Sequence, residues 1–360
     1  MKPWTIEPRD PLVVRDGRPP AAGMPSSRSL DFPWPSTVAG LSRTRAGLGP
    51  DGRFDEQRIG GLLQESLKGP WLVELDASGA AHQLALPAPR DAVAFRDAAG
   101  AIRTLRLAPQ PLPASVKTSL PPGLTPLGFV GDAPRGKAVS AGAFWRWSAV
   151  ERWLTTGASP SDGDVFEPLA HERRFHVAID PETGTASDGK LFVSDGLRFW
   201  GGRRLALGFL ASDGLAMAPG AVKLGGEGRA SWLRAGGVGL PACPSALVDA
   251  IEKTRRARVL LATPAIFEGG ALPRAGSLFD APIIAARVDR PDVISGWDHA
   301  RNQPRASRRM VGAGTVYWVN LESVSDVRGW VAKAWAQAVP EQAAQDQRDG
   351  FGLAFVGVGS

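Results

Sequence analysis

The C-terminal part of this 360-residue chain alternates short apolar runs with amphipathic stretches in an order that few folds accommodate. Runs rich in β-branched and aromatic residues predict strands, whereas apolar residues three or four positions apart predict helices. The extended runs lie at 222–224, 259–262, 283–286, 315–319 and 353–356, and helical spacings begin after Ser245 and at Val327. Although there is one extended run more than its four strands, we interpret this order as strand, helix, strand, strand, helix, strand, which is typical of a ferredoxin-like (RRM-like) domain with an antiparallel sheet.

The N-terminal part repeats the same order less regularly. Its expected elements are a first strand ending near Val14, a helix from about Ser36, a helix at 148–154, and strands at 175–179 and 205–210. An insertion of about 80–170 separates them, and its proline-rich run at 107–113 predicts loops and short strands. A chain of this length usually exceeds one core. We therefore predict an α+β protein of two ferredoxin-like domains with glycine-rich loops, at 1–215 and 216–360.

The cysteine content and the hydropathy indicate a reducing compartment. The lone Cys243 cannot form an internal disulfide, and the start of the chain lacks the apolar run of a signal peptide. No apolar stretch approaches the roughly 20 residues that cross a bilayer. We expect a cytoplasmic protein with no membrane partner.

The charge balance is compatible with nucleic acid. The net charge is +6, and 34 of the 42 basic residues are arginine. Arginine presents a planar fork of donors that suits phosphates, but a GC-rich genome also favours arginine codons. The arginines become informative where they cluster with glycine-rich loops.

Catalytic and metal-binding patterns are missing from the sequence. The four histidines, at 82, 171, 176 and 299, share no metal-ligand spacing, and no Gly-x-Ser-x-Gly elbow is present. The string Gly131–Lys137 has the spacing of a phosphate-binding loop, but Pro134 removes a backbone donor and Ala138 stands where a magnesium-binding hydroxyl is needed. We expect no catalytic residue, no metal and no cofactor.

Two strings near the start of the chain predict a phosphate site. In Asp10–Pro19, a short strand leads into an Asp16–Gly17 turn between Arg15 and Arg18. In Phe32–Leu41, Ser36 or Thr37 stands where a helix would be capped. A helix N-terminus beside arginines favours anions.

A strand over Arg174–Asp180 would place Phe175, Val177 and Ile179 on one side and Arg174 and His176 on the other. The second side is either an RNA surface or the solvated side of a half-buried sheet. The turn that follows carries Lys190 and two glycines, and it could also touch a bound RNA strand.

A basic cluster in the C-terminal part leads directly into a glycine-rich turn. Its arginines are at 301, 305, 308 and 309, and Gly312–Gly314 follows. Side-chain cations and closely approaching backbone donors suit phosphate, although a solvated basic loop would look the same. Most tryptophans are expected in the core, but Trp34 and Trp297, beside turn residues, are candidates for base stacking or partner contact.

The strings described above belong to a larger set of short segments that follow one another in a fixed order along the chain. Besides the two opening strings they are Arg174–Asp180, Gly189–Phe192, Gly225–Arg229, Ile294–Asp298, Ala313–Trp318 and Gly350–Ala354. In this order the chain resembles the RAMP-superfamily subunit of type III-B CRISPR effector (Cmr) complexes that binds the 5′ tag of the guide RNA. The Gly350–Gly352 pattern resembles that superfamily's glycine-rich loop, or is a turn into the last strand.

The resemblance implies a non-catalytic RNA-binding subunit that holds the 5′ tag. Its implied partners are the polymerase-like large subunit, a neighbouring backbone RAMP subunit and, indirectly, foreign target RNA. The alternatives are a metal-independent endoribonuclease that cuts repeat RNA with His176 and Arg174, and a single-stranded RNA binder that acts alone. The RNA-binding candidates are Arg15, Arg18, Ser36, Thr37, Arg43, Arg174, His176, Lys190, Arg229, Arg305, Arg308, Arg309, Gly312, Gly314, Gly350 and Gly352.

Overall fold

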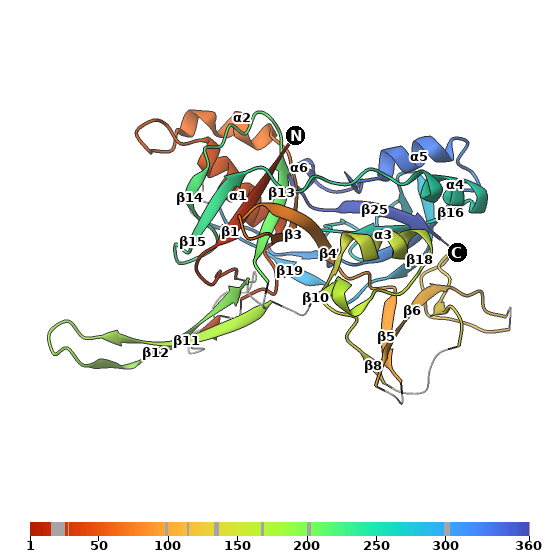
Figure 1. Ribbon diagram of the computed structural model, residues 1–360, viewed down its shortest axis with the longest axis horizontal. Helices are drawn as coiled ribbons and strands as arrows, with labels where there is room; N and C mark the ends of the chain where they lie inside the picture. The colour runs from red at the N-terminus through yellow and green to blue at the C-terminus, as the bar shows by residue number, and fades with distance from the viewer. Residues whose placement is uncertain are drawn as a thin grey trace.

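Two antiparallel sheets, of eight and six strands among the described residues, form the body of the molecule, and a long hairpin projects from it (Figure 1). The computed structural model describes residues 1–15, 26–27, 29–97, 100–113, 115–132, 137–166, 169–199, 203–298 and 303–359. Helices cover parts of both sheets. The mixed α+β architecture with mostly antiparallel sheets is therefore confirmed.

The first sheet contains most of the strands from the N-terminal part of the chain. In spatial order it consists of β10 (Val165–Phe166), β9 (Phe144–Arg146), β4 (Ala81–Pro87), β3 (Leu67–Leu75), β13 (Leu205–Ala211), β1 (Lys2–Pro8), β15 (Ala230–Ala235) and β14 (Gly220–Lys223). Its central strands are buried on both faces, because alternate residues of β3 point into two different cores. Leu72 packs in the core below α1 (Pro35–Ala46), whereas Trp71 and Val73 pack in the core shared with the second sheet.

The second sheet comes from the C-terminal part. Its spatial order is β17 (Ser277–Leu278), β18 (Ala281–Arg287), β23 (Val316–Asn320), β16 (Arg256–Leu261), β25 (Leu353–Val358) and β24 (Gln337–Ala338). Three helices contact β25, namely α3 (Trp147–Thr155), α4 (Ser245–Thr254) and α5 (Val327–Ala334). Since α3 belongs to the predicted insertion, this part of the insertion packs on the C-terminal sheet.

Four strands in each sheet follow the ferredoxin-like order of second, third, first and fourth: β3, β13, β1, β15 and β18, β23, β16, β25. The helices match this pattern only in part, because α1 follows the first strand of one set and α5 follows the third strand of the other. The strand expected at 222–224 was assigned to the C-terminal sheet, and this is wrong: it forms β14, which pairs with β15 in the first sheet. The two ferredoxin-like domains and their boundary stay predictions.

The insertion builds a small sheet of its own, of β7 (Leu127–Phe129), β6 (Ile102–Pro109), β5 (Ala92–Arg96) and β8 (Ala138–Val139), at the lower right of Figure 1. It is tied to the body by a buried ion pair between Arg258 and Asp91, which are 1% and 0% exposed. Trp153 Nε1 donates to Asp91 Oδ1 at 2.9 Å, and Arg258 Nε donates to the Val358 carbonyl at 2.7 Å. The pair therefore connects the insertion, α3 and β25.

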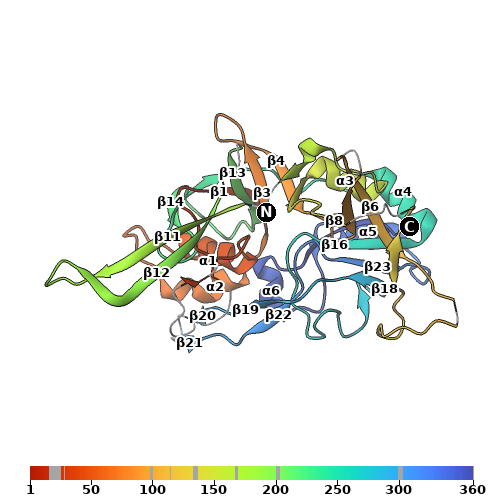
Figure 2. The same cartoon turned by 90° about the horizontal axis from the view of Figure 1, so that it is seen from below.

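The projecting hairpin consists of β11 (Ala170–Ile179) and β12 (Ala186–Arg198), and the two-residue β2 (Ser26–Ser27) pairs in parallel with β12. Figures 1 and 2 show it extending well away from the body. The strand was predicted correctly, but its burial was not: Phe175 is 74% exposed, and Val177 and Ile179 are exposed too. No second layer covers this face among the described residues.

The remaining short elements lie near the junction of the two sheets or in connecting loops. They are η1 (Glu56–Arg58), α2 (Ile59–Gln64), η2 (Asp162–Asp164), β19 (Asp292–Ile294), β20 (Trp297–Asp298), β21 (Gln303–Pro304), β22 (Arg308–Met310) and α6 (Ala344–Asp349). Figure 2 shows α1, α2, α6, β19 and β22 gathered at one place, and contacts between α6 and α1, α2 and β3 agree with this view. Within the described residues, no helix is long and apolar enough to span a bilayer.

Candidate nucleic-acid interface

The N-terminus of α1 lies where the two sheets meet. Trp34 occupies the cap position and Pro35 the first turn, where a proline's missing N–H costs nothing. The predicted cap at Ser36 or Thr37 is wrong: both lie inside the first turn, and neither hydroxyl forms a cap hydrogen bond. Both side chains are only partly buried. The hydroxyls and the first-turn N–H of Ser36 are thus left facing the surface.

Two cavities share Ser36 at this point. The junction pocket, of about 280 Å³, is lined by Ser36, Ile294, Ser295, Arg305, Arg308, Asp346, Asp349 and Phe351, among others. The α1 groove, of about 550 Å³, runs between α1 and β14 and is lined by Ser36, Thr37, Gly40, Arg45, Lys223 and Gly225, among others. Residues that are far apart in the sequence, from the helix start to the basic cluster, therefore line two adjacent cavities with Ser36 between them.

Two of the candidate arginines are engaged in ion pairs with buried carboxylates. Arg308 donates to both oxygens of Asp346, at 2.6 and 2.9 Å. Arg43 is 9% exposed and donates to Asp349 Oδ1 at 2.6 Å and to the carbonyls of Leu62 and Glu65. Arg43 thus fastens α1 to α6 and α2, while Arg308 neutralises a buried acid and stays partly exposed.

Arg305 and Arg309 differ from these two arginines. Both are exposed, and neither side chain forms an ion pair with a described residue. The backbone holds Arg305 in place, because its carbonyl accepts a hydrogen bond from Ser295 Oγ at 2.7 Å. Of the cluster's arginines that the structure describes, a set that leaves out Arg301, these two guanidiniums remain available to a ligand.

The candidate glycines lie against other parts of the backbone. Gly350 ends α6 with φ +99°, and a Cβ at this position would lie 2.6 Å from the Gly69 carbonyl oxygen. Gly314 has φ +83°, and a Cβ there would lie 2.5 Å from the Ala88 carbonyl oxygen. Close packing therefore accounts for both glycines. Gly312 also lies beside the insertion, near Arg90, and Gly352 contacts Gln342.

The opening string lies beside a second predicted string. Gly226 N donates to the Val13 carbonyl at 2.7 Å, and Glu227 accepts from both Arg15, at 3.4 Å, and Arg229, at 2.6 Å. Gly225 lines the α1 groove, so this pair of arginines lies at its margin. Arg18 lies outside the described residues.

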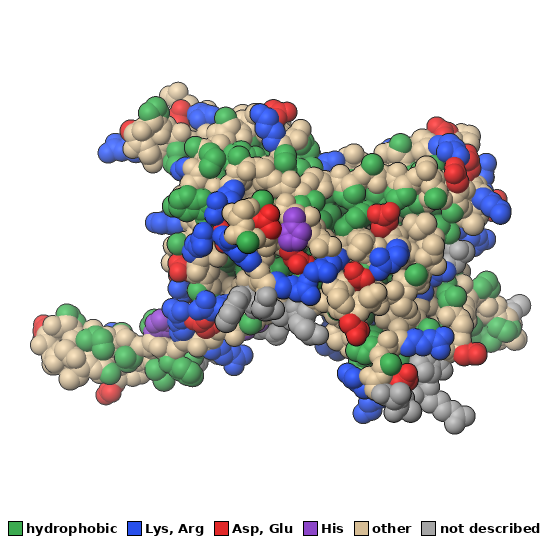
Figure 3. Space-filling model, in the orientation of Figure 1, with side chains coloured by type: hydrophobic (Ala, Val, Ile, Leu, Met, Phe, Trp, Pro, Cys, Tyr) green, Lys and Arg blue, Asp and Glu red, His purple; other side chains and the backbone are tan. Residues whose placement is uncertain are grey.

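The hairpin has two different faces. Phe175 pairs with Val193 and Val177 with Leu191, so one face is apolar and, except for Val193, exposed. The other carries Arg174, which is paired with Glu172, and His176, whose ring stacks on Phe192 at 5.0 Å and whose Nε2 lies 2.8 Å from Ser194 Oγ. Figure 3 shows hydrophobic side chains along the hairpin and cations where it joins the body. Lys190, near the turn, is exposed.

Electrostatic contacts fix the base of the hairpin. Hydrogen bonds from Arg198 and Arg174 hold the pKa of Glu172 below its ordinary value. His171 lies between two carboxylates, with Nδ1 3.2 Å from Asp195 Oδ1 and Nε2 2.9 Å from Asp31 Oδ1. The sequence offered no signal for this arrangement, because Asp31 is 140 positions from His171. The described residues contain no cluster of three or more side chains suited to a metal ion.

The sequence matches the CRISPR-associated protein family Cas_Cmr3 over residues 4–359. The chain belongs to this family. The match confirms the family resemblance that the ordered strings suggested, and it covers both sheets, the insertion and the hairpin. No curated protein matches the chain.

Solved structures resemble this Cas_Cmr3 chain in fold at low sequence identity. A chain of the type III-B Cmr-beta complex bound to cognate target RNA has a TM-score of 0.50 and 15% identity, covering 88% of this chain and 86% of that chain. The same kind of complex with AMPPnP gives 0.49 and 14%, with the same coverages. A chain of the Csm3–Csm4 subcomplex of the type III-A CRISPR-Cas interference complex gives 0.40 and 8%, covering 88% and 92%.

Proposed function

We propose that this protein is a non-catalytic RNA-binding subunit of a type III-B CRISPR effector complex, and that it holds the 5′ tag of the guide RNA along the region formed by the junction pocket and the α1 groove. The observation that carries the proposal is the convergence of Ser36, Thr37 and Arg305 from distant parts of a Cas_Cmr3 chain. The family assignment supports membership of a CRISPR effector.

The chemistry of this region suits a single RNA strand. The first turn of a helix presents unpaired N–H groups and the positive end of the helix dipole, both of which favour phosphate oxygens. Arg305 adds a cation to the junction pocket and Lys223 adds one to the α1 groove, the two cavities that share Ser36. Hydroxyls such as those of Ser36 and Thr37 complete the kind of mixed donor set that contacts phosphate and sugar.

The hairpin supplies a second contact surface. Exposed aromatic and aliphatic side chains on a ribbon that leaves the body are suited to stacking against bases or packing against another subunit. In the proposed complex the neighbouring backbone subunit and the polymerase-like large subunit contact this chain. Foreign target RNA is an indirect partner, which this chain does not itself bind. The Cmr-beta chain that this protein resembles at a TM-score of 0.50 comes from an assembly bound to cognate target RNA, which supports partners of this kind.

The surroundings of His176 support the non-catalytic proposal. Its ring stacks on Phe192 and hydrogen-bonds to a serine hydroxyl, and the neighbouring Arg174 is paired with Glu172. The endoribonuclease alternative would therefore need the other ring nitrogen, Nδ1, to act as general base, and Arg174 to leave Glu172 for the scissile phosphate. Repeat-containing RNA incubated with the purified chain, with and without magnesium or manganese, should stay intact. Specific cleavage that disappears in His176→Ala would favour the endoribonuclease alternative.

Sequencing of copurified RNA tests the binding proposal. Guide RNA recovered with the chain from cells that carry the complete complex should be enriched in 5′ ends that begin at the tag. Recovery of RNA without a common 5′ end would instead support a single-stranded RNA binder that acts alone.

A further inference from the structure

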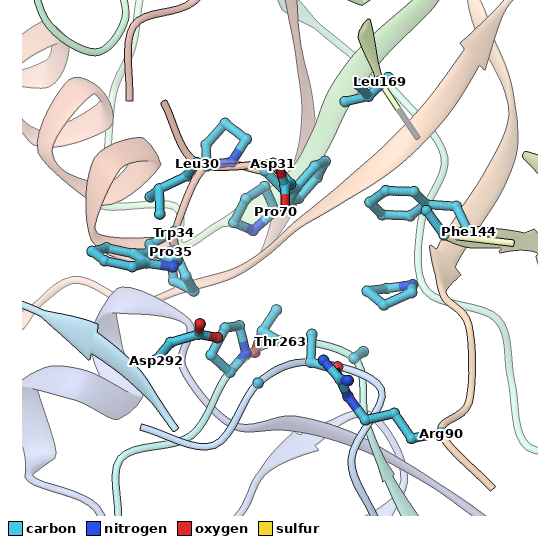
Figure 4. Close-up of a pocket in the computed structure, with 18 residues that line it drawn as sticks. Leu30, Asp31, Trp34, Pro35, Pro70, Arg90, Phe144, Leu169, Thr263 and Asp292 are labelled. Carbon is cyan, nitrogen blue, oxygen red and sulfur yellow. Dashed lines mark hydrogen bonds between the residues drawn. The ribbon is translucent and has the colours of Figure 1, made fainter. Parts of the chain in front are cut away.

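A cavity of about 300 Å³ beside the junction pocket has a lining suited to a flat heterocycle. It lies between the loop before α1, the strand β19 and the turn at Gly312, and prolines and aromatic rings line much of it. Figure 4 shows Trp34 and Asp292 at one end and Phe144 and Arg90 toward the other. This volume is at the lower end of small-ligand sites, the size expected for one base rather than a polymer segment.

Trp34 offers a fixed aromatic surface in this cavity. Its partly buried ring packs on a small cluster formed by Ile266, Ile294, Met310 and Phe351. A ring held in this way loses little conformational freedom when a second ring stacks on it. Base stacking on such a surface is independent of sequence, so discrimination has to come from a polar group.

Asp292 is the polar group at the same end. Its carboxylate forms no hydrogen bond with a described residue, and desolvation raises its pKa although Arg90 opposes the shift. Arg90 is committed elsewhere: Nε donates to the Ala313 carbonyl at 3.0 Å, and the guanidinium pairs with Asp289. Asp292 is exposed at the mouth of the cavity, so its carboxylate is open to a ligand, and a ligand that supplied two N–H groups would form two direct hydrogen bonds with it.

We propose that this cavity takes a single guanine base of the bound RNA, stacked on Trp34, with its N1–H and N2–H groups donating to the Asp292 carboxylate. Guanine is the one standard RNA base with two adjacent donors on its Watson–Crick edge. Adenine and cytosine place a ring-nitrogen lone pair beside the amino group, and uracil flanks its single donor with carbonyls. The proposal rests on the proposed function, since it gives one nucleotide of the guide RNA a specific site.

A base-substitution experiment tests this site. Labelled single-stranded oligouridine carrying one guanine, adenine, cytosine or inosine would be titrated with the full chain and with Asp292→Asn, Trp34→Ala and Asp280→Asn. A bidentate base contact discriminates by about 1–3 kcal/mol, so guanine should bind roughly 5- to 150-fold more tightly than the other standard bases, with inosine between. Asp292→Asn should abolish this preference, so that the oligonucleotide carrying guanine binds no more tightly than the one carrying adenine. Trp34→Ala should weaken the binding of all four oligonucleotides, because each would lose its stacking surface. The distant Asp280→Asn variant should bind them as the native chain does.

The outcomes separate this inference from the proposed function. Oligouridine binding without a guanine preference in the native chain would overturn the guanine site and leave RNA binding intact. A guanine preference that survives Asp292→Asn in a folded variant would overturn the role of Asp292. Absence of any RNA binding would overturn both proposals. The comparison of guanine with inosine uses the native chain, so it does not depend on whether a substituted protein folds.

Discussion

Removing the charge of Asp91 should destabilise the whole protein, because this carboxylate neutralises the guanidinium of Arg258, which has no access to water. Asp91→Asn keeps the shape of the side chain and an oxygen that accepts from Trp153 Nε1, but leaves the 1%-exposed Arg258 without its counter-charge. Arg106 lies close to the same pair, and burial, together with repulsion from Arg258, lowers its pKa to about 10. The substitution would therefore leave the buried cation of Arg258 close to the partly buried cation of Arg106 with no carboxylate between them.

The expected loss follows from breaking one partner of a buried pair, which costs about 3–5 kcal/mol. Because Arg258 also donates to the carbonyls of Trp153 and Val358, its own position should persist and the penalty should not relax away. Urea unfolding followed by tryptophan fluorescence would measure the change in midpoint. The control is Arg328→Met, which removes an exposed ion pair with Asp249 and should not shift the midpoint measurably.

A second variant refines this test. Arg258→Met combined with Asp91→Asn removes both charges, and it should recover part of the loss because an uncharged pair carries no uncompensated charge. If Asp91→Asn shifts the midpoint no further than Arg328→Met does, the ion pair is not what joins the insertion and α3 to the second sheet.

Three further outcomes follow from the structure. Replacing Arg305 and Arg309 by Ala should lower the slope of log affinity for guide RNA against log salt by roughly 0.7 for each phosphate that is no longer neutralised, whereas Arg274→Ala, in an exposed pair with Glu268, should leave the slope unchanged. Arg15→Lys should weaken tag binding by about 1–2 kcal/mol while the large subunit still copurifies; lost docking with intact RNA binding would make this loop a protein interface. Because desolvation raises the pKa of Cys243 to about 11, its alkylation by iodoacetamide at pH 8 should be on the order of 100-fold slower than that of a free cysteine and should rise with pH until about 11; a plateau near pH 9 would contradict this.

Local patterns in the sequence predicted which segments form strands better than they predicted which strands pair with each other. The strands at 259–262, 283–286, 315–319 and 353–356 are present as β16, β18, β23 and β25. The pattern at 222–224 also predicted a strand, but local sequence does not specify a pairing partner, and β14 joins the first sheet. The alternation of Phe175, Val177 and Ile179 suggested one buried face, yet burial depends on a second layer, which the described residues do not supply for the hairpin.

In the candidate site, too, the sequence indicated individual residues but not their long-range contacts. Ser36, Arg305 and Arg308 were chosen as separate strings, and the fold brings them to one pocket. The pairing of Arg43 with Asp349 spans 306 positions and therefore left no local signal. Proline at the first turn of α1 moved the cap to Trp34, a detail that the serine and threonine preference alone would miss.

Mapping of cross-links to the tag tests the central claim most directly. A guide RNA with 4-thiouridine placed at single positions of its 5′ tag would be assembled into the effector complex, irradiated and digested, and the cross-linked peptides identified by mass spectrometry. The account predicts adducts within 29–45 and 303–311, the segments that carry the start of α1 and the exposed arginines Arg305 and Arg309. Adducts confined to the far helices α4 and α5, or found only on other subunits, would contradict it.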